Sequence, residues 1–268
     1  MKTEPTPDIA WRDLVPLSPA EKIWELLLSL PWLALSLWLY DADWWWLGAL
    51  ASFYFFLTGL RQSHNAQHYA LGLPRPWQDV VLFVLSVLML SSMHAVQVTH
   101  LHHHRHCLED EDVEGATARK CWWRTLLEGP LFPARLHLAA WRLGTRRQRR
   151  WIAAEVAAAG LGIGLVLGVW RGAALCWHVA AMLLGECFTA FFAVWSVHHD
   201  CAARDIGRTQ RGAWITTLSY SMFFHVEHHL YPAVPTGHLA ELARRLDAVA
   251  PQFQKRRVLQ SDLSTNSA

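Results

Sequence analysis

The chain has 268 residues, of which 53% are hydrophobic and 17% charged, with a formal net charge of +2. So small a net charge argues against a nucleic-acid-binding protein. The apolar residues stand in blocks with the charges between them, a distribution typical of an integral membrane protein.

The apolar blocks predict an all-α integral membrane protein with four transmembrane helices in two hairpins and a cytosolic helical cap. Residues 1–22 form a loose, proline-rich cytosolic leader without the features of a signal peptide. The tryptophans at the start of the second block indicate a membrane-interface belt. The predicted spans are residues 23–40, 44–62, 151–170 and 173–197.

A fifth apolar segment, residues 80–93, is predicted not to cross the membrane. Its continuous apolar run, Val80–Leu90, is much shorter than the roughly 20 residues that a crossing needs. A crossing here would also put the histidines before and after the segment on opposite faces, where they could not share one site.

The remaining segments complete a single domain over residues 23–260. Residues 107–150 are polar and basic with interleaved tryptophans, which predicts a segment lying on the cytosolic membrane surface. A nucleic-acid-binding arm is the less favoured interpretation of the same segment. Leu239–Val249 has the spacing of an amphipathic helix, and residues 261–268 are predicted to be disordered.

Three histidine clusters follow spans or flank the basic segment, so the positive-inside rule places all of them on the cytosolic face. On a helix, residues spaced i, i+3 and i+4 lie on one side, where their imidazoles form a platform for metal. The clusters comprise His64 and His68, then His100, His103 and His104, and finally His225, His228 and His229.

The number of imidazoles predicts two metal ions. One further ligand from His198 or His199 brings the set to nine, whereas a single zinc takes about four ligands. Imidazole suits zinc, copper, iron and nickel, so the type of ligand does not select the metal.

In order and spacing, these clusters resemble the three histidine boxes of the membrane fatty acid desaturase family, over roughly residues 40–240. The segment Glu227–Pro235 is also similar to the end of the third box. The resemblance implies a non-haem di-iron centre that activates O2 and oxidises an unactivated C–H bond of a lipid. It also implies that the eight box histidines are iron ligands.

The resemblance implies a ninth ligand at the cytosolic end of the last span, for which we prefer His198 over His199. Some relatives have an asparagine four residues before that ligand, which supports a water at the metal. Val194 and Trp195 stand at those places here, so another group would have to fill that role.

Neutral imidazoles leave the metal charge uncompensated, so carboxylates near the boxes are expected to accept hydrogen bonds from the ligand rings. Asp112, Asp200 and Glu227 are our candidates, from a wider set that also includes Glu109, Asp110 and Glu114. Glu186, deep in the last span, is expected to line a substrate tunnel. For the other histidines, packing or surface positions are favoured: His94, His102, His106, His137, His178 and His238.

We therefore expect a fatty acyl desaturase with two iron ions, O2 as co-substrate and a lipid or acyl-chain substrate. Electrons would come from a separate ferredoxin-like or cytochrome-like donor. The basic residues 142–150 are expected to dock an acidic donor or, as an equal alternative, to contact anionic lipid. The expected location is a bacterial inner membrane, with the metal site facing the cytosol. The alternatives are a hydroxylase or ketolase of carotenoids, alkanes or other lipids on the same scaffold, and a non-enzymatic metal carrier.

Overall fold

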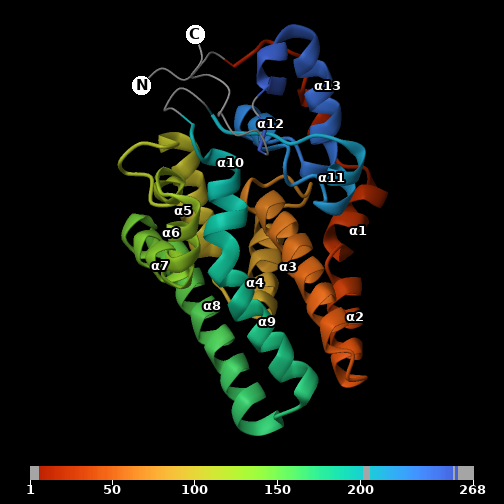
Figure 1. Cartoon of the computed structure of the whole chain (residues 1–268), viewed down its shortest axis with the longest axis vertical. Helices are drawn as coiled ribbons and strands as arrows, with labels where there is room; N and C mark the ends of the chain where they lie inside the picture. The colour runs from red at the N-terminus through yellow and green to blue at the C-terminus, as the bar shows by residue number, and fades with distance from the viewer. Residues whose placement is uncertain (1–5, 202–205, 256, 259–268) are drawn as a thin grey trace.

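The computed structural model describes residues 6–201, 206–255 and 257–258, and within these ranges the chain is helical (Figure 1). One isolated bridge, between Thr209 and Arg257, is the single strand-like pairing in the described ranges. The prediction of an all-α protein is confirmed. The helices are α1 Pro19–Leu27, α2 Leu30–Asp41, α3 Trp45–Gln67, α4 Arg75–Met89, α5 Met93–His106, α6 Trp122–Glu128, α7 Phe132–Leu143, α8 Arg146–Leu165, α9 Ala173–Thr189, α10 Ser196–His198, α11 Ala213–Leu218, α12 His225–Leu230 and α13 Leu239–Val249.

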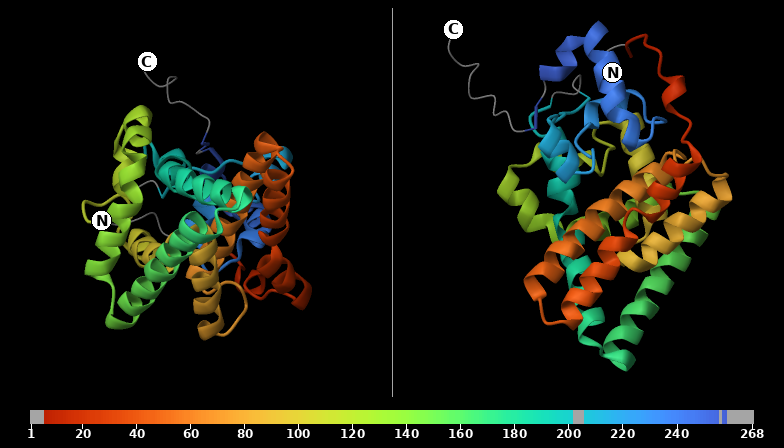
Figure 2. Two further views of the ribbon diagram at one scale, coloured as in Figure 1. Left: turned by 90° about the horizontal axis from the view of Figure 1, so that it is seen from below. Right: turned by 90° about the vertical axis from the view of Figure 1, so that its right-hand side faces the viewer.

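Two pairs of long helices form one end of the molecule. α2 and α3 pack along each other on either side of a short turn, and α8 and α9 are joined at residues 171–172. Both turns lie at the end opposite α12 and α13 (Figures 1 and 2). Wider π-helical turns extend α8 through Val166–Trp170 and α9 through Ala190–Trp195.

Three helical stretches of the described chain are long and apolar enough to cross a membrane: Pro19–Asp41, Arg146–Trp170 and Ala173–His198. They cover three of the four predicted spans. α3 has 23 residues but is not among them, because its last turns are polar, with Arg61 and Gln62 among their residues. The crossing of residues 44–62 therefore stays a prediction.

α4 and α5 meet at a bend of 114°, the geometry of a re-entrant loop or of a broken span. At the bend, Leu90 has the left-handed backbone conformation with φ 60°, which is uncommon for a residue other than glycine. Ser92 then caps α5, because its hydroxyl accepts a hydrogen bond from the backbone N–H of Ala95. The chain thus reverses direction just before the second histidine cluster.

The third histidine cluster lies in a compact cap. Apolar residues of α12 and α13, among them Val226, Leu242 and Leu246, form a buried core. The segment before α1 packs on this core: Leu14 is buried, and the Trp11 ring lies 5.6 Å from that of Tyr231. The described part of the leader, residues 6–22, is therefore packed where the sequence predicted a loose segment. The predicted disordered tail, residues 261–268, lies outside the described residues.

Candidate metal centre

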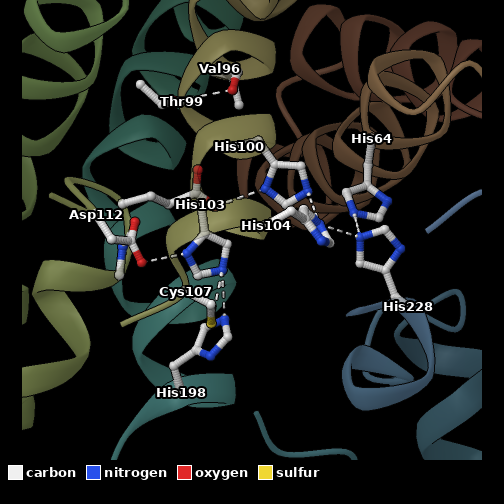
Figure 3. A network of polar contacts seen from close by, with 12 residues as sticks. His64, Val96, Thr99, His100, His103, His104, Cys107, Asp112, His198 and His228 are labelled. Carbon is white, nitrogen blue, oxygen red and sulfur yellow. Dashed lines mark hydrogen bonds and ion pairs between the residues drawn. The ribbon is translucent and has the colours of Figure 1, made fainter. Parts of the chain in front are cut away.

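Nine histidines, from four helices and the C-cap of α3, converge at the base of the cap. Figure 3 labels His64, His100, His103, His104, His198 and His228 of this set. The helices α3, α5, α10 and α12 come from separate parts of the chain, and each presents its histidines toward the same interior region. The nine residues are those expected from the sequence: His64, His68, His100, His103, His104, His198, His225, His228 and His229.

Eight of these histidines form two groups of four. Within each group, one potential ligand nitrogen per residue lies within 4.8 Å of the others. The first group is His64, His68, His100 and His228, and the second is His103, His198, His225 and His229. Four imidazole nitrogens at such spacing are a sufficient ligand set for one divalent metal ion.

His104 lies between the two groups. Its Nε2 atom is 2.9 Å from Nε2 of His228 and 3.2 Å from Nε2 of His100, both in the first group. Its ring also stacks on that of His229, in the second group, with 4.3 Å between the centroids. His104 can therefore add a ligand at the boundary between the two positions.

Two Nε2 atoms of the converging imidazoles are buried without a hydrogen-bond partner among the described residues. Nε2 of His68 and Nε2 of His229 are inaccessible to solvent and have no hydrogen-bond partner in the described part of the chain. Such unpaired buried nitrogens are rare and costly. Their position among converging imidazoles fits a metal ion, which would supply the missing partner.

Burial also keeps the cap imidazoles in the form that binds metal. It lowers the pKa of His225, His228 and His229 well below the ordinary value, and the neighbouring histidines lower it further. These rings are therefore neutral near pH 7, with a nitrogen lone pair available for coordination.

Two carboxylates accept hydrogen bonds from ligand rings. His103 donates through Nδ1 to Oδ2 of Asp112 at 2.7 Å, and His100 donates through Nδ1 to Oε1 of Glu114 at 3.0 Å. Each bond orients the opposite nitrogen, Nε2, toward the metal position. Asp112 was a sequence candidate, whereas Glu114 was only one of a wider set of nearby acids.

Asp112 is itself held in place by the backbone. It accepts hydrogen bonds from the N–H groups of Leu108 and Gly115, both at 2.9 Å. Burial alone would raise the pKa of its carboxyl group, but the bonds from His103 and the two backbone groups lower it. Asp112 therefore stays ionised and balances part of the charge of a bound cation.

The other two candidate acids, Asp200 and Glu227, do not accept hydrogen bonds from the rings of the converging histidines in the described ranges. Asp200 is exposed just after α10 and makes no bond to a ligand ring within the described ranges. Glu227 faces away from the histidines, because Arg211 and Thr209 donate hydrogen bonds to its carboxylate. Burial raises the pKa of the Glu227 carboxyl group, although Arg211 opposes the change. The hydrogen bonds from Arg211 and Thr209 attach α12 to the segment before α11.

A buried network connects α3, beside the first cluster, to α1 and to the segment after α12. Asn65, next to His64, accepts hydrogen bonds from the backbone and the hydroxyl of Thr236 at 3.0 and 2.7 Å. Its amide donates to Glu25 at 3.0 Å, and the same carboxylate pairs with Arg61. Sequence analysis did not find this role of Asn65, because it depends on the approach of a segment 171 positions away.

His198, and not His199, belongs to the metal groups. The Nε2 atom of His198 lies 3.1 Å from Nε2 of His103 and 2.7 Å from Nε2 of His225. The ring of His199 instead stacks on Trp195, with 4.2 Å between the centroids. The structure thus places His198, the preferred candidate, among the box histidines, and His199 apart from them.

The remaining candidates lie outside the two groups. Glu186 is on α9 and hydrogen-bonds Ser91 at the α4–α5 bend. A third set that could hold a metal ion, His102, His106 and Glu111, lies on the outer side of α5 and is partly exposed. It is separate from the nine converging histidines.

The fold and the site together define a helical protein with apolar helices long enough to cross a membrane and two four-histidine groups that could each hold a metal ion. The family model described as Fatty acid desaturase matches residues 42–260, most of the chain. The protein belongs to the fatty acid desaturase family, and its histidine groups agree with the use of metal by that family. The family also implies an oxidoreductase with an oxidase-like or desaturase-like function. None of the curated proteins matches the chain.

Proposed function

We propose that this protein is a di-iron, O2-dependent fatty acyl desaturase. The observation that carries the proposal is the pair of four-histidine groups in a chain of the fatty acid desaturase family. Imidazole alone does not select a metal. The oxidation of a C–H bond needs a redox-active metal, and zinc has no redox chemistry, so zinc does not suit this reaction. Two iron ions held by the nine histidines would supply O2 activation.

The chain's own residues would hold and orient the centre. Asp112 and Glu114 fix the rings of His103 and His100 on α5. Arg211 and Glu227 fix α12 from the opposite side. The burial of the site limits the access of water, which suits oxidation of a hydrocarbon at a reactive centre.

We propose a multi-pass protein of a bacterial inner membrane with the metal site facing the cytosol. Three helical stretches of sufficient length and apolarity support the membrane location. The arginines on α7 and at the start of α8 support the orientation, because basic residues are retained on the cytosolic side.

The substrate is proposed to be an acyl chain held among the apolar helices, with Glu186 lining the far part of its tunnel. Glu186 lies beside Ser91, where α4 and α5 bend. The Glu186→Gln variant is expected to change turnover or chain-length preference. If both are unchanged, Glu186 has no part in substrate binding.

Electrons are proposed to come from a separate ferredoxin-like or cytochrome-like protein that docks on the basic corner between α7 and α8. Arg142, Arg146 and Arg150 are exposed there. Charge reversal of these three residues is expected to weaken donor-dependent turnover, more so at low ionic strength. Unaffected turnover would contradict docking at this corner.

The function is tested by mass spectrometry of lipids from cells that express the wild type, His228→Ala or His178→Ala. His228 contacts His64 and His104 in the metal groups, whereas His178 is bonded to the backbone carbonyl of Leu88. A desaturase yields acyl chains about two mass units lighter with the wild type and not with His228→Ala. Added oxygen, or products confined to carotenoids or alkanes, would instead identify a hydroxylase or ketolase.

A further inference from the structure

A polar cavity of about 160 Å³ lies between α4, α5 and α8, outside the two histidine groups. It is large enough for several water molecules, and its polar lining offers them hydrogen-bond partners. The residues that line it are Tyr69, Asp79, His94, Gln97, Thr145, Arg147, Gln148 and Trp151.

His94, in the wall of this cavity, lies between two buried carboxylates. Its Nδ1 atom is 2.5 Å from Oε1 of Glu155, and its Nε2 atom is 3.4 Å from Oδ1 of Asp79. The ring is 1% exposed and stacks on Trp151, 5.0 Å away and parallel within 1°. Because its Nδ1–H is donated to Glu155, the ring can take up a proton at Nε2 and release it from the same atom to the cavity.

The outer side of this arrangement reaches solvent. Arg147 forms an ion pair with Asp79, and its side chain is 68% exposed. Inside, Ser92 donates its hydroxyl hydrogen to Glu155 and its backbone N–H to His137. The titratable and charged groups around His94 are therefore Asp79 on α4, Arg147 and Glu155 on α8 and, through Ser92, His137 on α7.

The inner side of the cavity approaches the first metal group. Gln97 lies about one helical turn after His94 and one turn before His100. Its side-chain amide donates to the backbone carbonyl of Gln67 at 3.1 Å, directly before His68. Tyr69, which also lines the cavity, directly follows His68.

The proposed function needs such a route. In desaturation, one O2, two electrons from the donor protein, two protons from water and two hydrogen atoms of the substrate become two water molecules and a double bond. In hydroxylation, the same electrons and protons reduce one oxygen atom to water while the other enters the substrate. Both reactions draw two protons from the aqueous phase into a buried site.

We propose that these protons pass through this cavity, from Asp79 at its mouth to His94 and on through cavity water beside Gln97. The proposal rests on the proposed function, because only O2 reduction at the histidine groups creates the demand for protons. In this route His94 carries the proton and Glu155 orients its ring.

The test compares wild type, His94→Ala and His178→Ala, with and without added imidazole. Loss of His94 is expected to lower kcat by about tenfold or more, with the KM for lipid and the iron content unchanged. Imidazole entering the enlarged cavity should restore a large part of kcat in His94→Ala. It should not do so in His178→Ala, whose missing ring bonded the carbonyl of Leu88 outside the cavity.

A second readout does not depend on turnover. Metal-free His94→Ala is expected to bind imidazole in calorimetry, and metal-free wild type and His178→Ala are expected to bind less. Unchanged kcat in His94→Ala overturns the route, as does a loss of kcat that bound imidazole does not restore. If the wild type oxidises no lipid, the proposed function itself is overturned. That result differs from the two outcomes for His94→Ala, which overturn only the proton route.

Asp79→Asn provides a second variant with almost the same shape, should His94→Ala fail to fold. It is expected to lower kcat and to increase the solvent deuterium isotope effect, because proton uptake becomes slower. If folded, iron-loaded Asp79→Asn has the kcat and the solvent deuterium isotope effect of the wild type, the route is also overturned.

Discussion

The Nε2 atoms of His64 and His228 lie 3.0 Å apart, although 164 positions separate the two residues in the chain. His64 comes from the last turns of α3, and His228 comes from the short helix α12 in the cap. His228 also lies 2.9 Å from His104 on α5. A single side chain of the cap therefore contacts both earlier clusters.

Truncation of His228 is expected to empty the first metal position. We predict that His228→Ala lowers the iron content from about two ions per chain to about one or fewer, as measured by elemental analysis. The control His178→Ala removes a histidine that bonds the backbone carbonyl of Leu88 outside these groups, and its iron content should equal that of the wild type. Equal iron in wild type and His228→Ala would contradict the assignment of His228 as a ligand.

The orientation of His103 depends on the carboxylate of Asp112. Asp112→Asn is expected to weaken metal binding about 10- to 100-fold, since it removes the charge that orients and polarises the ring. Gly115→Ala should act in the same direction, because a Cβ there would collide with Oδ2 of Asp112. Competition with a chelator measures both effects. Wild-type affinity in both variants would show that Asp112 does not support a ligand.

Asn65 is expected to stabilise the contact between the first cluster and the cap. Asn65→Ala leaves the buried N–H of Thr236 without its acceptor, so we predict a loss of about 1–3 kcal/mol in the free energy of unfolding. Ser63→Ala is the matched control, because Ser63 is equally buried but bonds only the carbonyl of Leu60 in its own helix. Unfolding in detergent should therefore show a clearly larger loss for Asn65→Ala than for Ser63→Ala.

His238 gives the stability of the cap a dependence on pH. Burial alone would lower its pKa, but hydrogen bonds to the carboxylate of Glu21 and to the carbonyl of Leu14 raise it above 6.5. A raised folded-state pKa stabilises the protein fully below about pH 6.5, and the effect is lost as pH rises through the folded value.

His238→Gln should therefore lower the unfolding temperature most at pH 5.5–6.5 and progressively less toward pH 9. Thermal unfolding of both proteins across this range provides the measurement. A difference that grows with pH would mean that the ring is neutral in the folded protein.

Local periodicity was sufficient to predict several parts of the structure. Leu239–Val249 was expected as an amphipathic helix and is α13, with the same limits. The spacing of His100, His103 and His104 implied one face of a helix, and α5 provides it. In both cases the pattern and its consequence lie within a few turns of one element.

Features that depend on distant contacts were not predictable in this way. Asp112 and Glu114 reach their histidines because the chain folds back after α5, where Leu108 has a positive φ of 60°. The π-helical turns before His198 change the helical register, so spacing alone did not decide between His198 and His199. The packing of Trp11 on Tyr231 joins the two ends of the sequence, which no local pattern reveals.

The four-histidine groups have a consequence for the order of events during biosynthesis. Each group takes ligands from α5 and from α12, and α12 begins only at His225. A ribosome that has completed all the long apolar helices has therefore not yet made the residues that complete either position. With the proposed membrane location and metal centre, insertion would precede metal loading, and a chain that ends after α10 would be unable to assemble either group.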